Sequence, residues 1–288
     1  MSASNVIVHR RRSTPAPCER RVSNPAGPLR WAARAWFSTA ALGQLAFSLY
    51  VGLFYGLTAL NNGPRRWNEI MNKGYVPGDT TFNAVLALHL GMAVAITLGG
   101  LLQLVPGLRR AAPAFHRWNG RLYLLLSLAM AVGGLTLIWI RGGAAGDRAQ
   151  HVGTSLNALV IVGCAAATWW QARTGRPQAH RRWALRLFLA VSGVWFFRIG
   201  LMLWIVLNQG PVGFDPDRFT GPFLTGLSFA QWLLPLVALE GYLRATRHAV
   251  WVQWSVAVLL MGLALVTLAG SGAATAILWL PPLRHAMA

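Results

Sequence analysis

The amino-acid sequence predicts an all-α fold: a polytopic transmembrane helical bundle of about seven spans, with its N-terminus in the cytoplasm. Three observations predict this fold. Of the 288 residues, 55% are hydrophobic and only 11% are charged, whereas soluble domains carry about 25% charged residues. Long apolar runs follow one another along the chain, and arginines cluster between these runs. About 20 apolar residues cross the hydrocarbon core of a bilayer, so each run is a candidate span.

Seven segments are long and apolar enough to be spans. They are 36–60, 82–105, 116–140, 151–170, 181–207, 222–243 and 249–270. We expect the apolar stretch at 270–280 to extend the seventh span or to lie at the interface, with a short eighth span as the alternative. No cleavable signal peptide is expected, because the first apolar run begins late and is too long.

The spans divide the chain into four parts. Spans two to five are predicted to form a core four-helix bundle that contains two histidine-bearing hairpins. The parts are a flexible basic cytoplasmic tail at 1–34, the first span and outer loop at 35–81, the core bundle at 82–208, and the peripheral C-terminal spans at 209–288.

The distribution of basic residues sets the predicted orientation. The tail and the loops after spans two, four and six hold 17 of the 26 basic residues, so the positive-inside rule places them in the cytoplasm. This topology explains the net charge of +19 better than nucleic-acid binding does. Lys73 is the single lysine among these residues. Such a bias towards arginine is typical of a GC-rich bacterial genome, so we expect a multi-pass protein in the lipid bilayer of the bacterial cytoplasmic membrane.

Four histidines lie near the ends of the four predicted core spans. His89 and His151 lie towards the outside, in spans two and four, whereas His116 and His180 lie towards the inside, in spans three and five. A haem iron in such a bundle takes one neutral imidazole from each of two helices. These histidines are therefore candidate metal ligands of two b-type haems, one near each face of the membrane. The alternative is that histidines at helix ends lie in the headgroup zone and bind nothing.

A weak internal repeat accompanies the histidines. Corresponding histidines of the two hairpins are separated by 62 and 64 residues, and both inner histidines stand in the pattern P-x-x-H-R, which begins at Pro113 and Pro177. Proline is favoured in the first turn of a helix. A duplicated helical hairpin produces such a repeat, as is common in membrane folds.

Other side chains near the histidines are candidate cofactor-binding residues. Tyr123 shares the helical face of His116, where small residues leave room for a flat ligand or for a close helix. Arg121 and Arg186 are candidates to hold haem propionates, with contact to lipid phosphate as the alternative. Arg198 is a charge inside span five and therefore a functional-site candidate. Its expected partner is Asp147, an outer propionate or backbone carbonyls.

One more charged residue has a simpler explanation. Glu240 at the end of span six has Arg244 four residues further along, and a local ion pair is expected.

The histidine–arginine motifs resemble those of a bacterial family of multi-span predicted membrane proteins of unknown function. The matching residues extend from His89 through HRW-x-GR-x-Y at 116–123 to HRRW-x-x-R at 180–186 and Arg198. The resemblance covers about 83–208 and implies a membrane location and a span pattern, with no established activity. The family pattern does not require a histidine at position 151. The histidine arrangement is also similar to that of ascorbate-reducible di-haem b-type cytochromes, whose ligands lie on four successive helices.

Two functional hypotheses follow. The first is transmembrane electron transfer by haem b, with a quinol or another small reductant as donor and an unidentified acceptor. The second is a cofactor-free membrane protein, which would be a transporter, a lipid-interacting protein or an assembly partner. The sequence shows no conspicuous broken helix and no P-loop in favour of transport. Hydrolase and metalloprotease motifs are missing, and only seven acidic residues are available for acid–base catalysis.

Overall fold

The computed structural model describes residues 27–61, 63–71, 74–139 and 146–287, and these residues form helices joined by short connections. The described part contains no strand. The elements are α1 (Gly27–Asn61), η1 (Pro64–Glu69), α2 (Thr80–Leu104), α3 (Pro106–Ala111), α4 (Pro113–Trp139), α5 (Arg148–Arg173), α6 (Pro177–Val191), α7 (Gly193–Asn208), α8 (Pro222–Ala245), α9 (Val250–Ala273), η2 (Ala274–Trp279) and α10 (Leu280–Met287).

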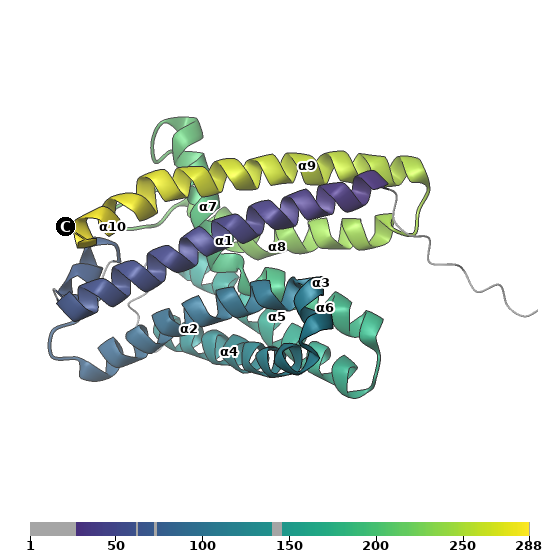
Figure 1. Cartoon of the computed structure of the whole chain (residues 1–288). Coiled ribbons are helices and arrows are strands. Elements are labelled where there is room, and N and C mark those ends of the chain that lie inside the picture. Colours follow the sequence, from purple (N-terminus) through teal and green to yellow (C-terminus); the bar gives the residue numbers. More distant parts are fainter. Residues whose placement is uncertain (1–26, 62, 72–73, 140–145, 288) are drawn as a thin grey trace, which may run out of the picture.

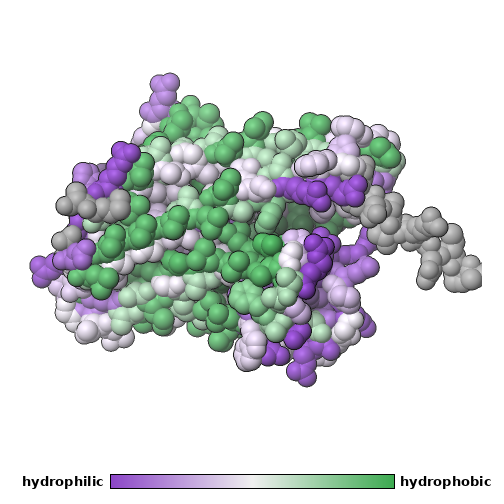
Figure 2. All heavy atoms as spheres, in the orientation of Figure 1, coloured by the Kyte–Doolittle hydropathy of each residue, from purple (hydrophilic) through white to green (hydrophobic). Residues whose placement is uncertain are grey.

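The helices have the length and composition of membrane spans. Six of them are each long and apolar enough to cross a bilayer, and the bent pair α6–α7 makes a seventh span when it is taken as one. Figure 2 shows hydrophobic residues across the middle of the molecule and hydrophilic residues at its two ends. The chain is therefore a multi-pass membrane protein, and the predicted all-α polytopic bundle is confirmed.

The first helix begins earlier than the sequence indicates. α1 starts at Gly27, so 27–34 are helical although we assigned them to the tail. The reason is burial, because Leu29 and Ala32 pack against Ala245 and Ala257 from α8 and α9. The rest of the predicted tail, 1–26, lies outside the described residues.

The last apolar stretch continues the seventh span. α9 passes without a break into the π-helix η2 and then into α10, and together they form one apolar helical segment from Val250 to Ala286. Residues 270–280 therefore extend the seventh span, as the first of our expectations stated, and a separate eighth span does not form.

The helices lie in two groups (Figure 1). α1 and α9 run side by side with α8 near them, and α2, α4, α5 and α6 lie together on the other side of α1. The largest cluster of buried apolar side chains joins α1, α7 and η2 and includes Phe54 and Trp279. A second cluster joins α4, α5 and α6 around Tyr123 and Leu187. Much of the buried apolar packing thus involves spans that lie outside the predicted four-helix core.

Span five is broken, and our expectation of a continuous helix at 181–207 is wrong. α6 ends at Val191 and α7 begins at Gly193, with an angle of 50° between them. Side chains from two other helices bind at the break. Asn157 Nδ2 donates to the carbonyl of Ala190 at 3.1 Å, and Gln44 Nε2 donates to Ser192 Oγ at 3.0 Å. Side chains inserted into the backbone ladder are a known cause of sharp bends.

Candidate functional site

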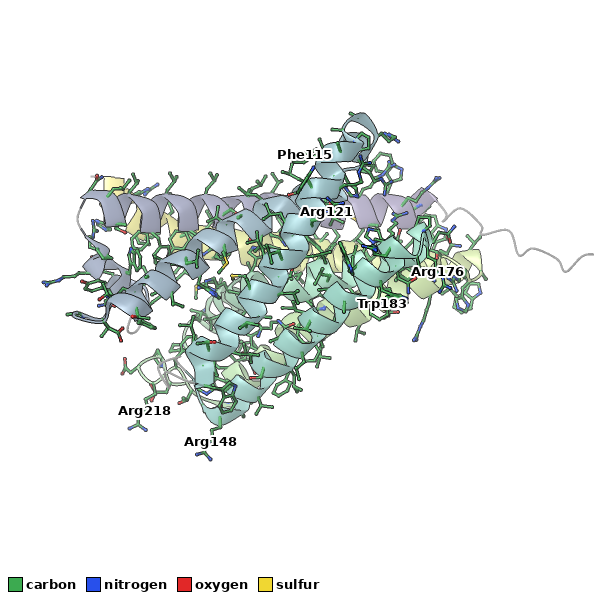
Figure 3. The ribbon with its side chains drawn as sticks, turned by 90° about the horizontal axis from the view of Figure 1, so that it is seen from below. Phe115, Arg121, Arg148, Arg176, Trp183 and Arg218 are labelled. Carbon is green, nitrogen blue, oxygen red and sulfur yellow. The ribbon has the colours of Figure 1, made fainter. Side chains whose placement is uncertain are left out.

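The predicted inner histidines lie near each other at one end of the bundle. His116 is in the first turn of α4 and His180 in the first turn of α6, and each of these helices begins with a proline. Arg109 and His180 are close enough to interact electrostatically with His116. Figure 3 shows Arg176, the residue just before α6, and Trp183 of α6 towards this end, whereas Arg148 and Arg218 lie at the opposite end. Two separate helices therefore bring these two imidazoles to one region.

The imidazole of His180 is held by α5. Its Nδ1 lies 3.0 Å from the carbonyl oxygen of Thr168. Because a carbonyl oxygen only accepts, Nδ1 carries the proton in this contact and Nε2 keeps its lone pair. Metal-ligating histidines are commonly oriented by such a bond from their other ring nitrogen. The contact thus leaves Nε2 of His180 suited to ligation.

α2 packs closely against α4 beside His116. Gln103 Nε2 donates to the backbone carbonyl of His116 at 3.0 Å. The ring of the buried Tyr123 packs against Gly100. A Cβ added at Gly100 would lie only 2.9 Å from this ring. Gly100 of α2, which faces Tyr123, is thus used for close helix packing. Tyr123 occupies this interface.

The predicted outer histidines each have a buried ring nitrogen without a hydrogen-bond partner in the described part of the chain. These atoms are Nδ1 of His89 and Nε2 of His151. His89 faces Gly133 of α4, and the ring of His151 meets the ring of Trp139 edge-on at 6.0 Å between centroids. Gly133 and Trp139 are separated by about 9 Å along the axis of α4. The two outer histidines therefore contact α4 at different levels.

Two of the predicted arginines lie in different environments. Arg121 is exposed on α4, with its guanidinium 5.1 Å from the centre of the Trp118 ring (Figure 3). Arg186 is half-buried and binds Glu240 of α8, with Nε and Nη2 each 2.7 Å from Oε1. We expected Glu240 to pair with Arg244, and this is wrong. The carboxylate of Glu240 instead binds Arg186, which lies on the neighbouring helix α6.

Arg198 lies on α7, whereas the four histidines lie on α2, α4, α5 and α6. Its guanidinium lies over the ring of Phe47 from α1, 5.4 Å from the centroid. Asp147, which we considered as its partner, instead accepts a hydrogen bond from the backbone nitrogen of Gln150 at 2.9 Å. The surroundings of Arg198 are therefore aromatic side chains of α1.

Sequence reasoning missed a buried polar cluster at the break in span five. Gln44 of α1, Asn157 of α5 and Gln231 of α8 are all buried and converge on Ser192 and Gly193. An added Cβ at Gly193 would lie 2.8 Å from Asn157 Nδ2 and 3.6 Å from Gln231 Oε1. The available signal was one amide side chain in each of three apolar spans, which does not by itself reveal that they meet.

The comparison with known families agrees with the motifs. Residues 86–216 match the family described as "Predicted membrane protein (DUF2306)". The family resemblance inferred from the HRW and HRRW motifs is confirmed. The DUF2306 match contains all four histidines, Arg198 and the break in span five, whereas α1, α8 and α9 lie outside it. No curated protein and no solved structure matches the chain.

Proposed function

We propose that the chain is a b-type haem electron-transfer protein of the bacterial cytoplasmic membrane, with His116 and His180 as the axial ligands of an inner haem. The observation that carries this proposal is the approach of two histidines from separate helices at one end of the bundle. Bis-histidine haem sites take one neutral imidazole from each of two helices. When bound, haem supplies one-electron redox chemistry.

The residues at this end fit such a cofactor in their donor chemistry. The contact from His180 Nδ1 to the Thr168 carbonyl orients the ring and leaves the Nε2 lone pair available. Arg109 adds positive charge beside His116, which favours an anionic group such as a propionate. Arg121 is a further propionate candidate, whereas Arg186 already has a carboxylate partner in Glu240.

His89 and His151 are the proposed ligands of an outer haem. Each has an unpaired buried ring nitrogen within the described residues, and burial without a partner is costly for a polar atom. Because these histidines contact α4 at different levels, ligation of one iron by both requires the helices to shift. We propose a quinol or another small reductant as the electron donor.

An absorption spectrum tests the proposal. Protein purified after expression with a haem precursor is expected to show a reduced-minus-oxidised difference spectrum typical of low-spin haem b. His116→Ala and His180→Ala are each expected to lose the inner haem, whereas His248→Ala, which changes an exposed histidine outside the bundle, keeps the full haem content. A wild-type protein without haem absorbance would contradict the proposal.

A second candidate function is transport without a cofactor, and the break in span five favours it. Discontinuous helices often form substrate sites in transporters, where backbone groups and polar side chains face the substrate. Here Asn157 Oδ1 is buried and has no hydrogen-bond partner in the described residues, beside the break. A colourless wild-type protein would support transport over haem binding. Transport activity should then be lost in Asn157→Leu and retained in His116→Ala.

A further inference from the structure

The charge of Arg198 has no acidic partner in the described part of the chain. The ion pairs there join Arg66 to Glu69, Arg186 to Glu240 and Arg218 to Asp215. Arg198 itself lies over Phe47 and within electrostatic reach of Tyr50 and Tyr55, both from α1. A guanidinium in a membrane span is costly without a counter-charge, and such residues commonly mark ligand or ion sites.

Buried polar atoms lie in the core cluster that contains Phe47, the ring beneath this arginine. The indole nitrogens of Trp195 and Trp279 have no hydrogen-bond partner in the described residues, and the hydroxyl of Tyr50 has the hydroxyl of Tyr55 as its neighbour. Trp195, Trp279 and Tyr50 are only 2–3% exposed. An indole N–H can only donate, as can a guanidinium, so the cluster has an excess of donors. A buried unpaired donor is destabilising, which favours an acceptor at this place.

These donors belong to one continuous cluster of α1, α7 and η2. Trp279 packs on Phe47 and Tyr50, with ring centroids 5.5 and 6.2 Å apart. Arg198 lies over the same Phe47 ring, and Trp195 is one turn before Arg198 on α7. All of them except Arg198 belong to the core cluster that joins these helices. The Phe47 ring thus links the guanidinium of Arg198 to the indole of Trp279.

The backbone of η2 is a further feature of this place. Residues Ala274–Trp279 form a π-helix, and Trp279 is its last residue. π-Helical turns are rare and often lie at functional sites, because they redirect side chains that a regular helix would place elsewhere. The position of the Trp279 indole in the cluster thus coincides with a local departure from α-helical geometry.

We propose that Arg198, Trp279 and Tyr50 bind a small monovalent anion, either a halide or a carboxylate, in the half of the bundle predicted to face outward. The anion supplies the acceptor that the donors lack and balances the charge of Arg198. This anion site is separate from the histidines. The site is formed by α1, α7 and η2, whereas the histidines lie on α2, α4, α5 and α6. It does not depend on the proposed haem function.

Anion titration of the purified full-length protein tests this site. Chloride or formate, added at constant ionic strength in place of gluconate, is expected to raise the melting temperature and change the tryptophan fluorescence in a saturable way. A response to chloride assigns an inorganic ion, and a response to formate alone assigns a carboxylate. Equal behaviour in chloride, formate and gluconate would overturn the proposal.

Variants connect the response to the cluster. Trp279→Phe keeps an aromatic ring but removes one N–H donor, so the anion affinity is expected to fall about tenfold. Arg198→Gln is expected to abolish the response, and Arg218→Gln, which removes an exposed loop charge, is the matched control. His248→Ala, at an exposed histidine, should respond as the wild type does. An anion affinity that Trp279→Phe and Arg198→Gln both leave unchanged would also overturn the proposal.

Discussion

Arg186 illustrates how a charged residue is accommodated among apolar helices. Its guanidinium binds Glu240 of α8 and lies 4.7 Å from the centre of the Trp183 ring. The two charged side chains are 21% and 36% exposed, so the pair is neither fully hydrated nor fully buried. Loss of the arginine would leave a half-buried carboxylate without its counter-charge, which is more costly than the pair itself.

We expect Arg186→Gln to destabilise the fold. The predicted loss is about 1–2 kcal/mol, between the values for exposed and buried pairs. Thermal unfolding in detergent measures it, with Arg181→Gln on the exposed face of α6 as the control. The double variant Arg186→Gln/Glu240→Gln should recover part of the loss, because the unpaired carboxylate is removed. Equal melting temperatures of Arg186→Gln and Arg181→Gln would show that the Arg186–Glu240 ion pair contributes nothing to the stability of the fold.

Partners of single residues were the least predictable part of the site. The position of each histidine along its own helix follows from the helical rise, and His116 and His180 are close enough to interact electrostatically. The partner of Arg186 lies 54 residues further along the chain. Arg244 is nearer in sequence to Glu240, but the contact with Arg186 depends on how α6 and α8 pack. Helix packing is not encoded in local spacing.

At the scale of elements, the start of α5 is fixed by a capping residue. Asp147 accepts a hydrogen bond from the backbone nitrogen of Gln150 at 2.9 Å, and Thr225 of α8 donates to its other oxygen at 3.4 Å. The bond from the Gln150 backbone holds the pKa of the Asp147 carboxyl below its usual value. The charged form therefore stabilises the helix start and its contact with α8.

Asp147 should make the stability of this end of the bundle dependent on pH. Because its pKa is lower in the folded state, its contribution is complete above the ordinary carboxyl pKa of about 3.9 and is lost as the pH falls through the lower folded value. Asp147→Ala should cost about 1 kcal/mol at neutral pH, and the difference should disappear in acid. Melting curves of this variant and of Asp217→Ala, an exposed loop control, measure it. A constant difference at every pH would contradict the assignment.

The existence of the helices was predictable, whereas their breaks were not. Hydropathy locates each span because lipid requires apolar side chains and internal backbone hydrogen bonds over about 20 residues. From Leu187 to Leu207 this stretch is apolar on both sides of Ser192, so hydropathy does not locate the break there. The side chains that bind at the bend, Gln44 and Asn157, come from other spans.

For the whole molecule, the path of the bent pair decides on which sides the termini lie. α6 begins beside His116, at the end of the bundle where α4 starts. The loop after α7 meets the opposite end, because Gln150 at the start of α5 donates to the carbonyl of Phe219 at 3.2 Å. At that end Arg66, just after α1, also donates to the carbonyl of His285 at 3.3 Å. The start of α6 and the loop after α7 therefore lie at opposite ends of the bundle, despite the bend.

Figure 1 shows the C-terminus and the start of α1 at opposite ends of the molecule. If α6–α7 is a complete span, the seven crossings predict that the two ends of the chain lie on opposite sides of the membrane. With the arginine-rich tail in the cytoplasm, alkaline phosphatase fused to the C-terminus should be active outside and a fluorescent protein fused there should stay dark. Fusions after Arg110 and Arg247, at predicted inner loops, should behave in the opposite way. If α6–α7 were instead a re-entrant hairpin, six crossings would remain. The C-terminus would then lie inside, and the phosphatase at that position would be inactive.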